Sequence, residues 1–525
     1  MLDNKEEDLE RLAELCLSTA KQIKEHLAST GHPQMTFDQN GPQFFPQDSS
    51  PMEIQLARLN LRAAAKRLHD LVSGPDEVVV WNTYDITHDL NAFRYAAEYS
   101  IAAAVPLNST ISYSDLATKL SLDRKQLRQM LRQLIQIHVF SEPTLNQVSH
   151  TASSKLLITH EGVAAFNGYI ARDVFPMAAK QFEALEHFGH GNPHPHEAGL
   201  NFACKTNLPM FAYYEQPEQA GVRERFSKLM TYASSFPALS NSHLTAGFRW
   251  STLPPGSTIV DIAGNVGHCS IAIARATDPT VKLVVQDLPQ IVARAKDPAT
   301  SVVPADLRDR FTFMEHDFYT PQPIQGAAVY FLRMIMHDYS DAYCWKILRQ
   351  IVPAMGPDSR IVIMDQVSPP VGVLPTAIER MMRTQDLQMM LLLNARERDI
   401  GEWNDLVAGI SQQEEGAGKI EAVETAANSV VEPEEPKTEE PKTEEPKTEE
   451  PKTEEPKNEE AKAEDSTSET NSAPAAPGGT ATAEAPRGPP AKRLEIKNIV
   501  SPPGTMMSLI EIGFVAENGT GGGSV

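Results

Sequence analysis

STIVDIAGNVG, at residues 257–267, is an apolar run that leads directly into a turn with two glycines, Gly264 and Gly267. An apolar stretch, Ser270–Arg275, follows the turn. This order is typical of a buried strand that enters a helix. Glycine lets the backbone approach a ligand closely, and the first amides of the helix attract polar groups of a ligand. The stretch therefore predicts a strand, a turn and a helix, with either a cofactor at the turn or a glycine that the turn alone requires.

Three further apolar runs follow, and they end at Asp287, Asp317 and Arg333. Strands that alternate with helices at this spacing predict a parallel α/β sheet, which binds ligands beyond the carboxyl ends of its strands. Asp287 lies where a ribose diol would be bound, although it could instead cap the next helix. Asp317 and Phe318 could bracket an adenine ring, or Asp317 could be an ordinary loop residue. We expect these side chains to gather with Gly264 at one edge of the sheet.

A single histidine, His337, follows the last of these runs in the sequence His337-Asp-Tyr-Ser-Asp341. A neutral imidazole at this edge can act as a general base. A histidine beside an aspartate is more often structural. The preceding strand ends and a carboxylate 28 residues further on, Asp365, favour the catalytic interpretation. No His, Cys, Asp and Glu cluster has the spacing of metal ligands, so we expect no metal.

Composition limits the possible classes of protein. A chain of 525 residues is longer than a domain with a single hydrophobic core usually is, so two or more domains are expected. Residues 412–493 hold 21 acidic and 10 basic side chains, a net charge of −11, which is half of the total of −22. This acidity argues against nucleic acid as a partner. The N-terminus lacks the apolar core of a signal peptide, no apolar run reaches the ~20 residues that span a bilayer, and the four cysteines are scattered. These features predict a cytoplasmic protein without a membrane partner.

Four regions are expected along the chain. Residues 1–83 are N-terminal helices, with a second helix over roughly 52–72 that ends at Ser73-Gly-Pro75. Residues 84–175 form a winged-helix-like unit, in which Ser112 caps a helix. Residues 176–411 and 493–515 form the α/β domain. Residues 412–492 carry EEPKT repeats and are expected to be a disordered insertion, because proline recurs and large apolar residues are scarce.

Two features of this organisation bear on the fold and on the possible partners. Leu494–Val500 and Met506–Ile512 flank a Ser-Pro-Pro-Gly turn and predict a β-hairpin that joins the sheet after the insertion. Basic residues near the second helix of the winged-helix-like unit raise the alternative of DNA binding, but the same arrangement is a common dimerisation scaffold. These basic residues are Arg124, Lys125, Arg128 and Arg132.

The His337–Cys344 segment, HDYSDAYC, resembles the signature of the S-adenosylmethionine-dependent small-molecule O-methyltransferases of plant and fungal secondary metabolism. Asp287-Leu-Pro289, Asn394-Ala-Arg-Glu-Arg398 and the winged-helix-like unit are also similar to that family. The resemblance covers most of residues 85–411 and 494–515. It is nearest to the fungal group that methylates phenolic polyketides. It implies a class I methyltransferase (Rossmann-like) fold, a dimerisation domain and the cofactor S-adenosyl-L-methionine.

The resemblance also implies roles for individual residues. His337 matches the family's catalytic base, and its two flanking carboxylates fall on Asp365 and Glu397. The cofactor positions fall on Gly264, Asp287, Asp317, Phe318 and Arg333. The usual triple glycine is here Ala263-Gly264-Asn265, which places side chains where the methionine moiety would pass, and Asp365 is one methylene shorter than the family's Glu.

The function implied is methyl transfer to a phenolic hydroxyl of a small aromatic metabolite, with a homodimer as the expected assembly. A phenol has a pKa near ~10, so a base increases the phenolate that attacks the methyl group. Two Met pairs beside Asp386, Met381-Met382 and Met389-Met390, could line the acceptor pocket or pack in the core. The alternative is a catalytically silent member that uses the fold for binding or assembly, and its only support is Ala263 and Asn265.

Overall fold

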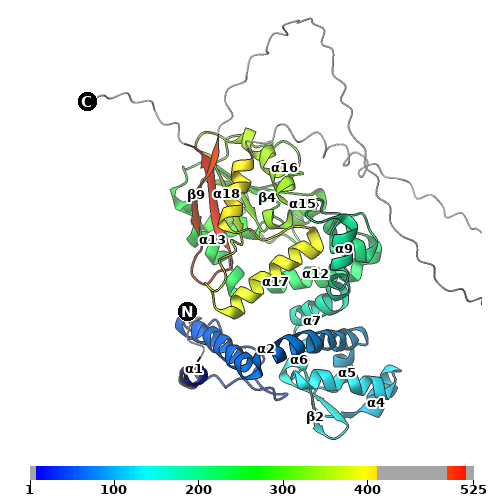
Figure 1. Ribbon diagram of the computed structural model, residues 1–525. Coiled ribbons are helices and arrows are strands. Elements are labelled where there is room, and N and C mark those ends of the chain that lie inside the picture. The colour runs from blue at the N-terminus through cyan, green and yellow to red at the C-terminus, as the bar shows by residue number, and fades with distance from the viewer. Residues whose placement is uncertain (1–7, 411–492, 516–525) are drawn as a thin grey trace, which may run out of the picture. The chain divides into compact units, whose positions relative to one another are not determined.

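The computed structural model describes residues 8–410 and 493–515 (Figure 1). Residues 411–492, which include the predicted disordered insertion, lie outside the described residues, as do residues 1–7 and 516–525. Within the described part, no helix combines the length and the apolar character that crossing a membrane requires.

Two helices form the N-terminal region. Helix α1, Leu9–Ser29, begins at Asp8, whose carboxylate accepts hydrogen bonds from the backbone N–H groups of Glu10 and Arg11. Helix α2, Met52–Glu98, kinks at Gly74, which has φ 82°. The sequence predicted that this helix ends at the kink, but the chain resumes the helix at Pro75. Proline is tolerated there because the first residue of a helical segment needs no N–H donor. The expected boundary at residues 83 and 84 therefore falls inside α2.

The winged-helix-like unit has the predicted helices and hairpin. Ser112 caps α4 by accepting a hydrogen bond from Asp115 N at 3.0 Å. A three-stranded sheet in the order β1-β3-β2 completes the wing, and Arg132 of α5 pairs with Glu142 of β2 at 2.7 Å. The elements of this unit are α3 Ile101–Ala104, β1 Ile111–Ser112, α4 Tyr113–Leu120, α5 Arg124–Gln136, β2 Phe140–Thr144 and β3 Gln147–His150.

Short helices connect this unit to the α/β domain. They are α6 Ala152–Thr159, α7 Glu161–Gly168, the π-helix η1 Tyr169–Val174, α8 Phe175–Ala178, α9 Gln181–Phe188, α10 Gly199–Cys204, α11 Met210–Tyr214, η2 Pro217–Gln219, α12 Ala220–Ser234, η3 Pro237–Leu239, α13 Asn241–Gly247 and η4 Trp250–Thr252.

A seven-stranded sheet in the order β6-β5-β4-β7-β8-β10-β9 forms the α/β domain. The first five strands in this order are parallel, and β10 is antiparallel to both of its neighbours. The predicted α/β class is therefore confirmed, and the expected hairpin is present as β9 and β10. The strands are β4 Thr258–Ile262, β5 Lys282–Asp287, β6 Phe311–Glu315, β7 Val329–Arg333, β8 Arg360–Asp365, β9 Leu494–Val500 and β10 Ser508–Phe514.

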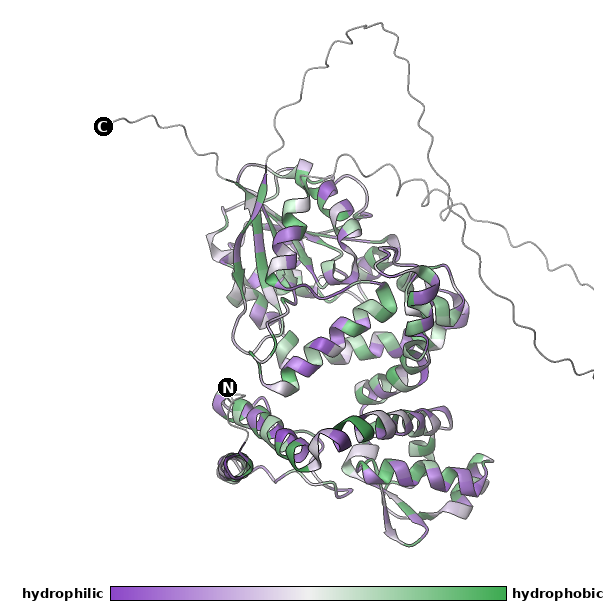
Figure 2. Cartoon of the chain, viewed as in Figure 1, coloured by the Kyte–Doolittle hydropathy of each residue, from purple (hydrophilic) through white to green (hydrophobic). Residues whose placement is uncertain are grey.

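Helices cover both faces of this sheet, because alternate residues of each strand point to opposite sides. On β4, Val260 and Ile262 pack in a core with α16 and α18, whereas Ile259 packs in another core with α13 and α14. Figure 2 shows green, apolar ribbon along the strands between these layers. The remaining helices of the domain are α14 His268–Ala276, α15 Pro289–Lys296, η5 Ala305–Arg310, η6 Met336–Asp338, α16 Asp341–Ile351, η7 Val352–Ala354, α17 Thr376–Leu393 and α18 Ile400–Gly409.

The strand order reverses direction at β4. The chain passes from β4 to β5 and β6 on one side, and then returns to place β7 on the other side of β4. Ligands of open α/β sheets bind at such a reversal, beyond the carboxyl ends of the strands. The turn after β4 and the residues after β7 lie at this point of the sheet.

Candidate active site

The turn after β4 is tied to the end of β5. Asp287 Oδ2 accepts a hydrogen bond from Asn265 N at 2.8 Å, and its Oδ1 accepts one from Leu288 N at 2.8 Å. The structure thus brings together the glycine turn and the strand-end acid. Burial is the main cause that raises the pKa of Asp287. Each carboxylate oxygen has a second lone pair, so Asp287 can still accept a hydrogen bond from a ligand hydroxyl.

Gly264 occupies a position with no room for a side chain. A Cβ atom there would lie 2.5 Å from Cγ of Asp261. Asp261 is itself buried and accepts a hydrogen bond from Ser270 Oγ at 2.6 Å, and burial raises its pKa to about 7. The glycine is therefore needed for close packing at the start of α14, as well as for any approach by a ligand.

The residues on either side of Gly264 have left-handed backbones. Ala263 has φ 55° and Asn265 has φ 53°, a region that glycine adopts readily and other residues rarely. Asparagine tolerates this conformation, and Asn265 Oδ1 accepts hydrogen bonds from Val266 N and from Arg294 Nη2. The two departures from the glycine triplet therefore keep a glycine-like backbone, at a cost in strain that falls mainly on Ala263.

Asp317 and Phe318 follow β6. Asp317 is exposed and accepts a hydrogen bond from Tyr319 N at 2.9 Å. Phe318 is half-buried, and its ring contacts the rings of Tyr319 and Tyr339 at centroid distances of 4.9 and 5.8 Å. Tyr339 belongs to the segment that carries His337, so an aromatic contact links that segment to the position expected for adenine.

Arg333 ends β7 and points to the same reversal of the sheet. Its Nη2 donates a hydrogen bond to Leu239 O at 2.8 Å. Its Nε is buried without a hydrogen-bond partner within the described residues. A buried, unpaired donor is costly unless a ligand accepts its hydrogen bond. Arg333 therefore offers a positively charged contact for an anionic ligand group.

His337 lies in the short helix η6 and is 5% exposed. Its Nδ1 is 2.8 Å from Glu397 Oε1, so the imidazole is in contact with one of the two carboxylates named from the sequence. Its Nε2 is 3.5 Å from Asp338 Oδ1. Burial lowers the pKa of the imidazole, but the negative charges of Asp338, Glu397 and Asp365 outweigh burial and raise it to about 10.

Asp365 occupies a different position from that expected of a second carboxylate on the imidazole. It ends β8, is fully buried, and its Oδ2 accepts a hydrogen bond from Met336 N at 3.0 Å. Its Oδ1 has no hydrogen-bond partner within the described residues. Burial is the main cause that raises its pKa to about 7. The contact of Asp365 is with the backbone next to His337.

Three residues at the site had no assigned role in the sequence analysis. Asp338 is the nearest carboxylate to His337 Nε2, Asp386 Oδ1 accepts a hydrogen bond from Glu397 N at 2.8 Å, and Arg398 is buried behind the His337 segment. Proximity in sequence could have suggested two of them, since Asp338 follows His337 and Arg398 follows Glu397, whereas no such signal points to Asp386. Of the methionines in α17, Met382 and Met389 are buried and Met381 is exposed.

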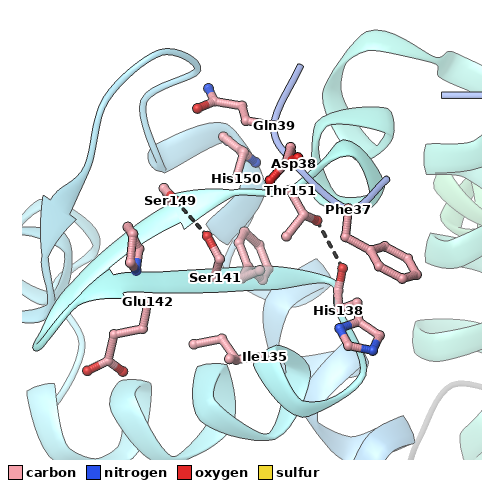
Figure 3. A pocket seen from close by; sticks show the side chains of 12 residues that line it. Phe37, Asp38, Gln39, Ile135, His138, Ser141, Glu142, Ser149, His150 and Thr151 are labelled. Carbon is pink, nitrogen blue, oxygen red and sulfur yellow. Dashed lines mark hydrogen bonds between the residues drawn. The ribbon is translucent and has the colours of Figure 1, made fainter. Parts of the chain in front are cut away.

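A cavity of about 520 Å³ lies elsewhere, between the loop at Phe37–Gln39 and strands β2 and β3 (Figure 3). Several of its polar side chains form hydrogen bonds within the protein, although the buried Nε2 of Gln39 has no partner within the described residues. Ser141 Oγ is 2.7 Å from Ser149 Oγ, and Thr151 Oγ1 donates to His138 O at 3.0 Å. No predicted site residue lines this cavity, and it carries no functional assignment.

Comparisons with known proteins identify the family. Residues 197–411 match the model of an O-methyltransferase domain. The chain is 33% identical over 401 residues to the O-methyltransferase pgmB of Aspergillus terreus, covering 76% of this chain and 90% of that protein. The chain belongs to the S-adenosylmethionine-dependent O-methyltransferases. It is also 34% identical over 407 residues to the O-methyltransferase VdtC of Byssochlamys spectabilis, covering 77% of this chain and 92% of that protein.

The fold of this O-methyltransferase is that of the class I methyltransferases. The crystal structure of OxaC in complex with SAH and oxaline superposes with a TM-score of 0.61 at 17% identity, and the match covers 96% of this chain and 98% of OxaC. The cofactor is S-adenosylmethionine. The strand-end residues fit it, since Asp287 keeps lone pairs for a ligand hydroxyl and the buried Nε of Arg333 needs an acceptor.

Proposed function

We propose that this O-methyltransferase methylates a phenolic hydroxyl of a small aromatic, polyketide-derived metabolite, with His337 as the general base. The observation that carries the proposal is the 2.8 Å contact between His337 Nδ1 and Glu397 Oε1. A carboxylate accepts hydrogen bonds, so Nδ1 must carry the proton in this contact. The tautomer that results presents Nε2 as the nitrogen that can take a proton from an acceptor.

Each residue has a separate task in the proposed reaction. When bound, S-adenosylmethionine supplies a methyl group on a sulfonium, and the electrons of the broken carbon–sulfur bond stay on sulfur. His337 Nε2 receives the hydroxyl proton while the acceptor oxygen attacks, an effect typically worth ~10²–10⁴-fold. Glu397 stabilises the imidazolium that forms and keeps the ring oriented.

The electrostatics of the site favour a phenol over an aliphatic alcohol. A phenolic hydroxyl has a pKa near ~10. The carboxylates around His337 raise its pKa, which brings the proton affinity of the imidazole closer to that of a phenolate. A base works best when proton transfer is close to balanced in energy and the base is unprotonated. Burial of His337, and any positive charge brought next to it, favour the neutral imidazole that the reaction needs.

Five residues are proposed to hold the cofactor. Gly264 lets the backbone of the turn approach it closely, Asp287 accepts hydrogen bonds from the ribose, Asp317 and Phe318 contact the adenine, and Arg333 contacts the carboxylate of the methionine moiety. The positions at the ends of β4, β5, β6 and β7 support this assignment, because these strand ends meet at the reversal of the sheet.

The experiment compares His337→Ala with the wild type. Binding of S-adenosylmethionine is measured by calorimetry, and transfer of a labelled methyl group is measured on a panel of phenols and matched aliphatic alcohols. We expect the variant to bind the cofactor and to lose transfer by ~10²-fold or more. His150→Asn is the matched control, because His150 is equally buried but lies in the winged-helix-like unit. Unchanged turnover in His337→Ala would refute the base, and preference for aliphatic alcohols would refute the acceptor.

The second half of α2 supports a homodimer. Every residue from 79 to 88 is exposed, so this part of the helix has no packed face within the chain. Its β-branched and aromatic residues have low helix propensity, and most helices in proteins are stabilised mainly by tertiary packing. This part of α2 therefore needs a packing partner. Apolar ribbon after the kink is visible in Figure 2. The exposed apolar residues after the kink are Val79 at 67%, Val80 at 51%, Trp81 at 50%, Tyr84 at 61% and Ile86 at 43%. We propose that a second copy of the chain covers them.

Sedimentation at micromolar protein tests the assembly. We expect the wild type to be a dimer and the double variant Trp81→Asp, Tyr84→Asp to be a monomer, because charges at the centre of an apolar interface are costly. Leu145→Asp is the matched control, since Leu145 is 73% exposed at the turn between β2 and β3. A monomeric wild-type protein would refute the proposed homodimer.

A further inference from the structure

The peptide unit that precedes His337 is held from both sides. Met336 N donates a hydrogen bond to Asp365 Oδ2 at 3.0 Å. Met336 O accepts a hydrogen bond from Arg398 Nη1 at 2.8 Å. Met336 is fully buried, so these bonds are shielded from water. The backbone next to the base is therefore fixed by one carboxylate and one guanidinium.

The same guanidinium reaches the residues after His337. Arg398 Nη2 donates a hydrogen bond to Tyr339 O at 2.8 Å, and Arg398 Nε donates one to Asp341 Oδ1 at 2.8 Å. One planar group thus contacts the chain before and after His337. Because Arg presents its donors in a rigid plane, the positions of these three acceptors are fixed relative to one another.

Arg398 is itself immobilised. Its side chain is fully buried and lies over the ring of Trp403, with 5.5 Å between the guanidinium carbon and the ring centroid. Its own carbonyl accepts a hydrogen bond from Ser368 N at 2.8 Å, which ties it to the segment after β8. The preceding residue, Glu397, contacts the imidazole. Two consecutive residues therefore hold the ring of His337 and the backbone that carries it.

We propose that Arg398 is a positioning residue for the methyl transfer, and that it keeps His337 Nε2 in place by fixing the carbonyls of Met336 and Tyr339 while Glu397 fixes the ring. This inference rests on the proposed role of His337 as the base. A misplacement of about 1 Å can cost ~10²-fold in rate even when the altered residue does not touch the substrate. A buried ion pair by itself is weak evidence for a contribution to stability.

Arg398→Lys tests the proposal, because lysine keeps the charge and loses the planar set of donors. We expect kcat to fall by ~10- to 100-fold, with the acceptor KM and the dissociation constant of S-adenosylmethionine within about 3-fold of the wild type. We also expect the acid limb of the pH profile of kcat to shift, since the contact between His337 and Glu397 loosens. A folded Arg398→Lys enzyme with the kcat and pH profile of the wild type would overturn the proposal.

Arg396→Lys is the matched control. Arg396 pairs with the same aspartate, with Nη2 2.6 Å from Asp341 Oδ2, but its side chain is 47% exposed. We expect wild-type kinetics from this variant. An equal loss of kcat in both lysine variants would overturn the proposal, because it would assign the effect to the ion pair with Asp341.

Two further variants distinguish a failure of the positioning role of Arg398 from a failure of the base assignment. If Arg398→Lys does not fold, Asp341→Ala tests the proposal in its place. This variant removes one of the three acceptors to which the guanidinium of Arg398 donates hydrogen bonds. A loss of kcat of about 3-fold or more at unchanged cofactor affinity supports the proposal, and an unchanged kcat overturns it. His337→Ala tests the base itself. Inactivity of His337→Ala together with full activity of Arg398→Lys would reject the positioning role and leave the base assignment standing.

Discussion

Glu397 Oε1 lies 2.8 Å from His337 Nδ1, although 60 residues separate the two along the chain. Both side chains are buried, with exposed fractions of 4% and 5%. The contact places a proton on Nδ1, because a carboxylate can only accept a hydrogen bond, and leaves Nε2 as the other ring nitrogen. Glu397 is held in turn through its backbone N–H by Asp386.

The charge of Glu397 is expected to be important for turnover. Glu397→Gln keeps the size of the side chain but removes the charge that stabilises the imidazolium, so we expect kcat to fall by ~10²–10⁴-fold. Binding of S-adenosylmethionine, measured by calorimetry, should be unchanged. Glu511→Gln is the matched control, a partly buried carboxylate on β10 that pairs with Arg360. A Glu397→Gln enzyme with wild-type kcat would contradict the assignment.

Asp365 is expected to act through the hydrogen bond that it accepts from Met336 N. Asp365→Asn keeps an oxygen acceptor, so we expect it to retain kcat within about 10-fold of the wild type. Asp365→Leu leaves the buried N–H unpaired, which costs ~1–3 kcal/mol, and should lower both kcat and thermal stability. Steady-state kinetics and thermal unfolding of the two variants distinguish these outcomes. If Asn is as damaging as Leu, the charge of Asp365 matters more than its hydrogen bond.

The pH dependence of turnover should respond to Asp338. Only the neutral imidazole is a base, so the rate should rise as the pH approaches the raised pKa of His337, which is about 10. Burial opposes the raised pKa of His337, and the charge of Asp338 is the largest cause that raises it. Asp338→Asn removes this negative charge, so the pKa of His337 should fall. We therefore expect the acid limb of the profile of kcat against pH to move to lower pH, and an unmoved limb would contradict this electrostatic account.

Ala263→Gly should raise the free energy of unfolding, and Gly264→Ala should lower it. Ala263→Gly relieves a left-handed strain of ~1–2 kcal/mol at an entropic cost of ~0.5–1 kcal/mol, so the folded state should gain about 0.5 kcal/mol. Gly264→Ala places a Cβ 2.5 Å from Cγ of Asp261 and should cost ~1–3 kcal/mol and weaken cofactor binding. Urea unfolding and calorimetry measure both effects. Stabilisation by Gly264→Ala would contradict the close packing of Gly264 against Asp261.

Several elements could be predicted because local chemistry determines them. The apolar run at 257–262 and the glycines after it predict β4 and its turn, and the hairpin of β9 and β10 follows from two apolar runs around a Pro-Pro-Gly turn. Ser112 caps a helix as expected, since an N-cap needs only its own first turn. The helix that continues beyond Gly74 was missed, because a glycine and a proline are typical both of an end and of a kink.

The amino-acid order alone determined the α/β class, the glycine turn and the position of His337 after a strand. These features depend on the spacing of apolar residues along the chain and on the φ/ψ preferences of single residues. Only the tertiary structure decided which carboxylate touches the imidazole, that Asp365 holds the backbone of Met336, and that Arg398 spans the segment around His337. These contacts join residues 29 to 62 positions apart. No local preference encodes such a pairing, since it exists only when strand ends and loops are packed against one another.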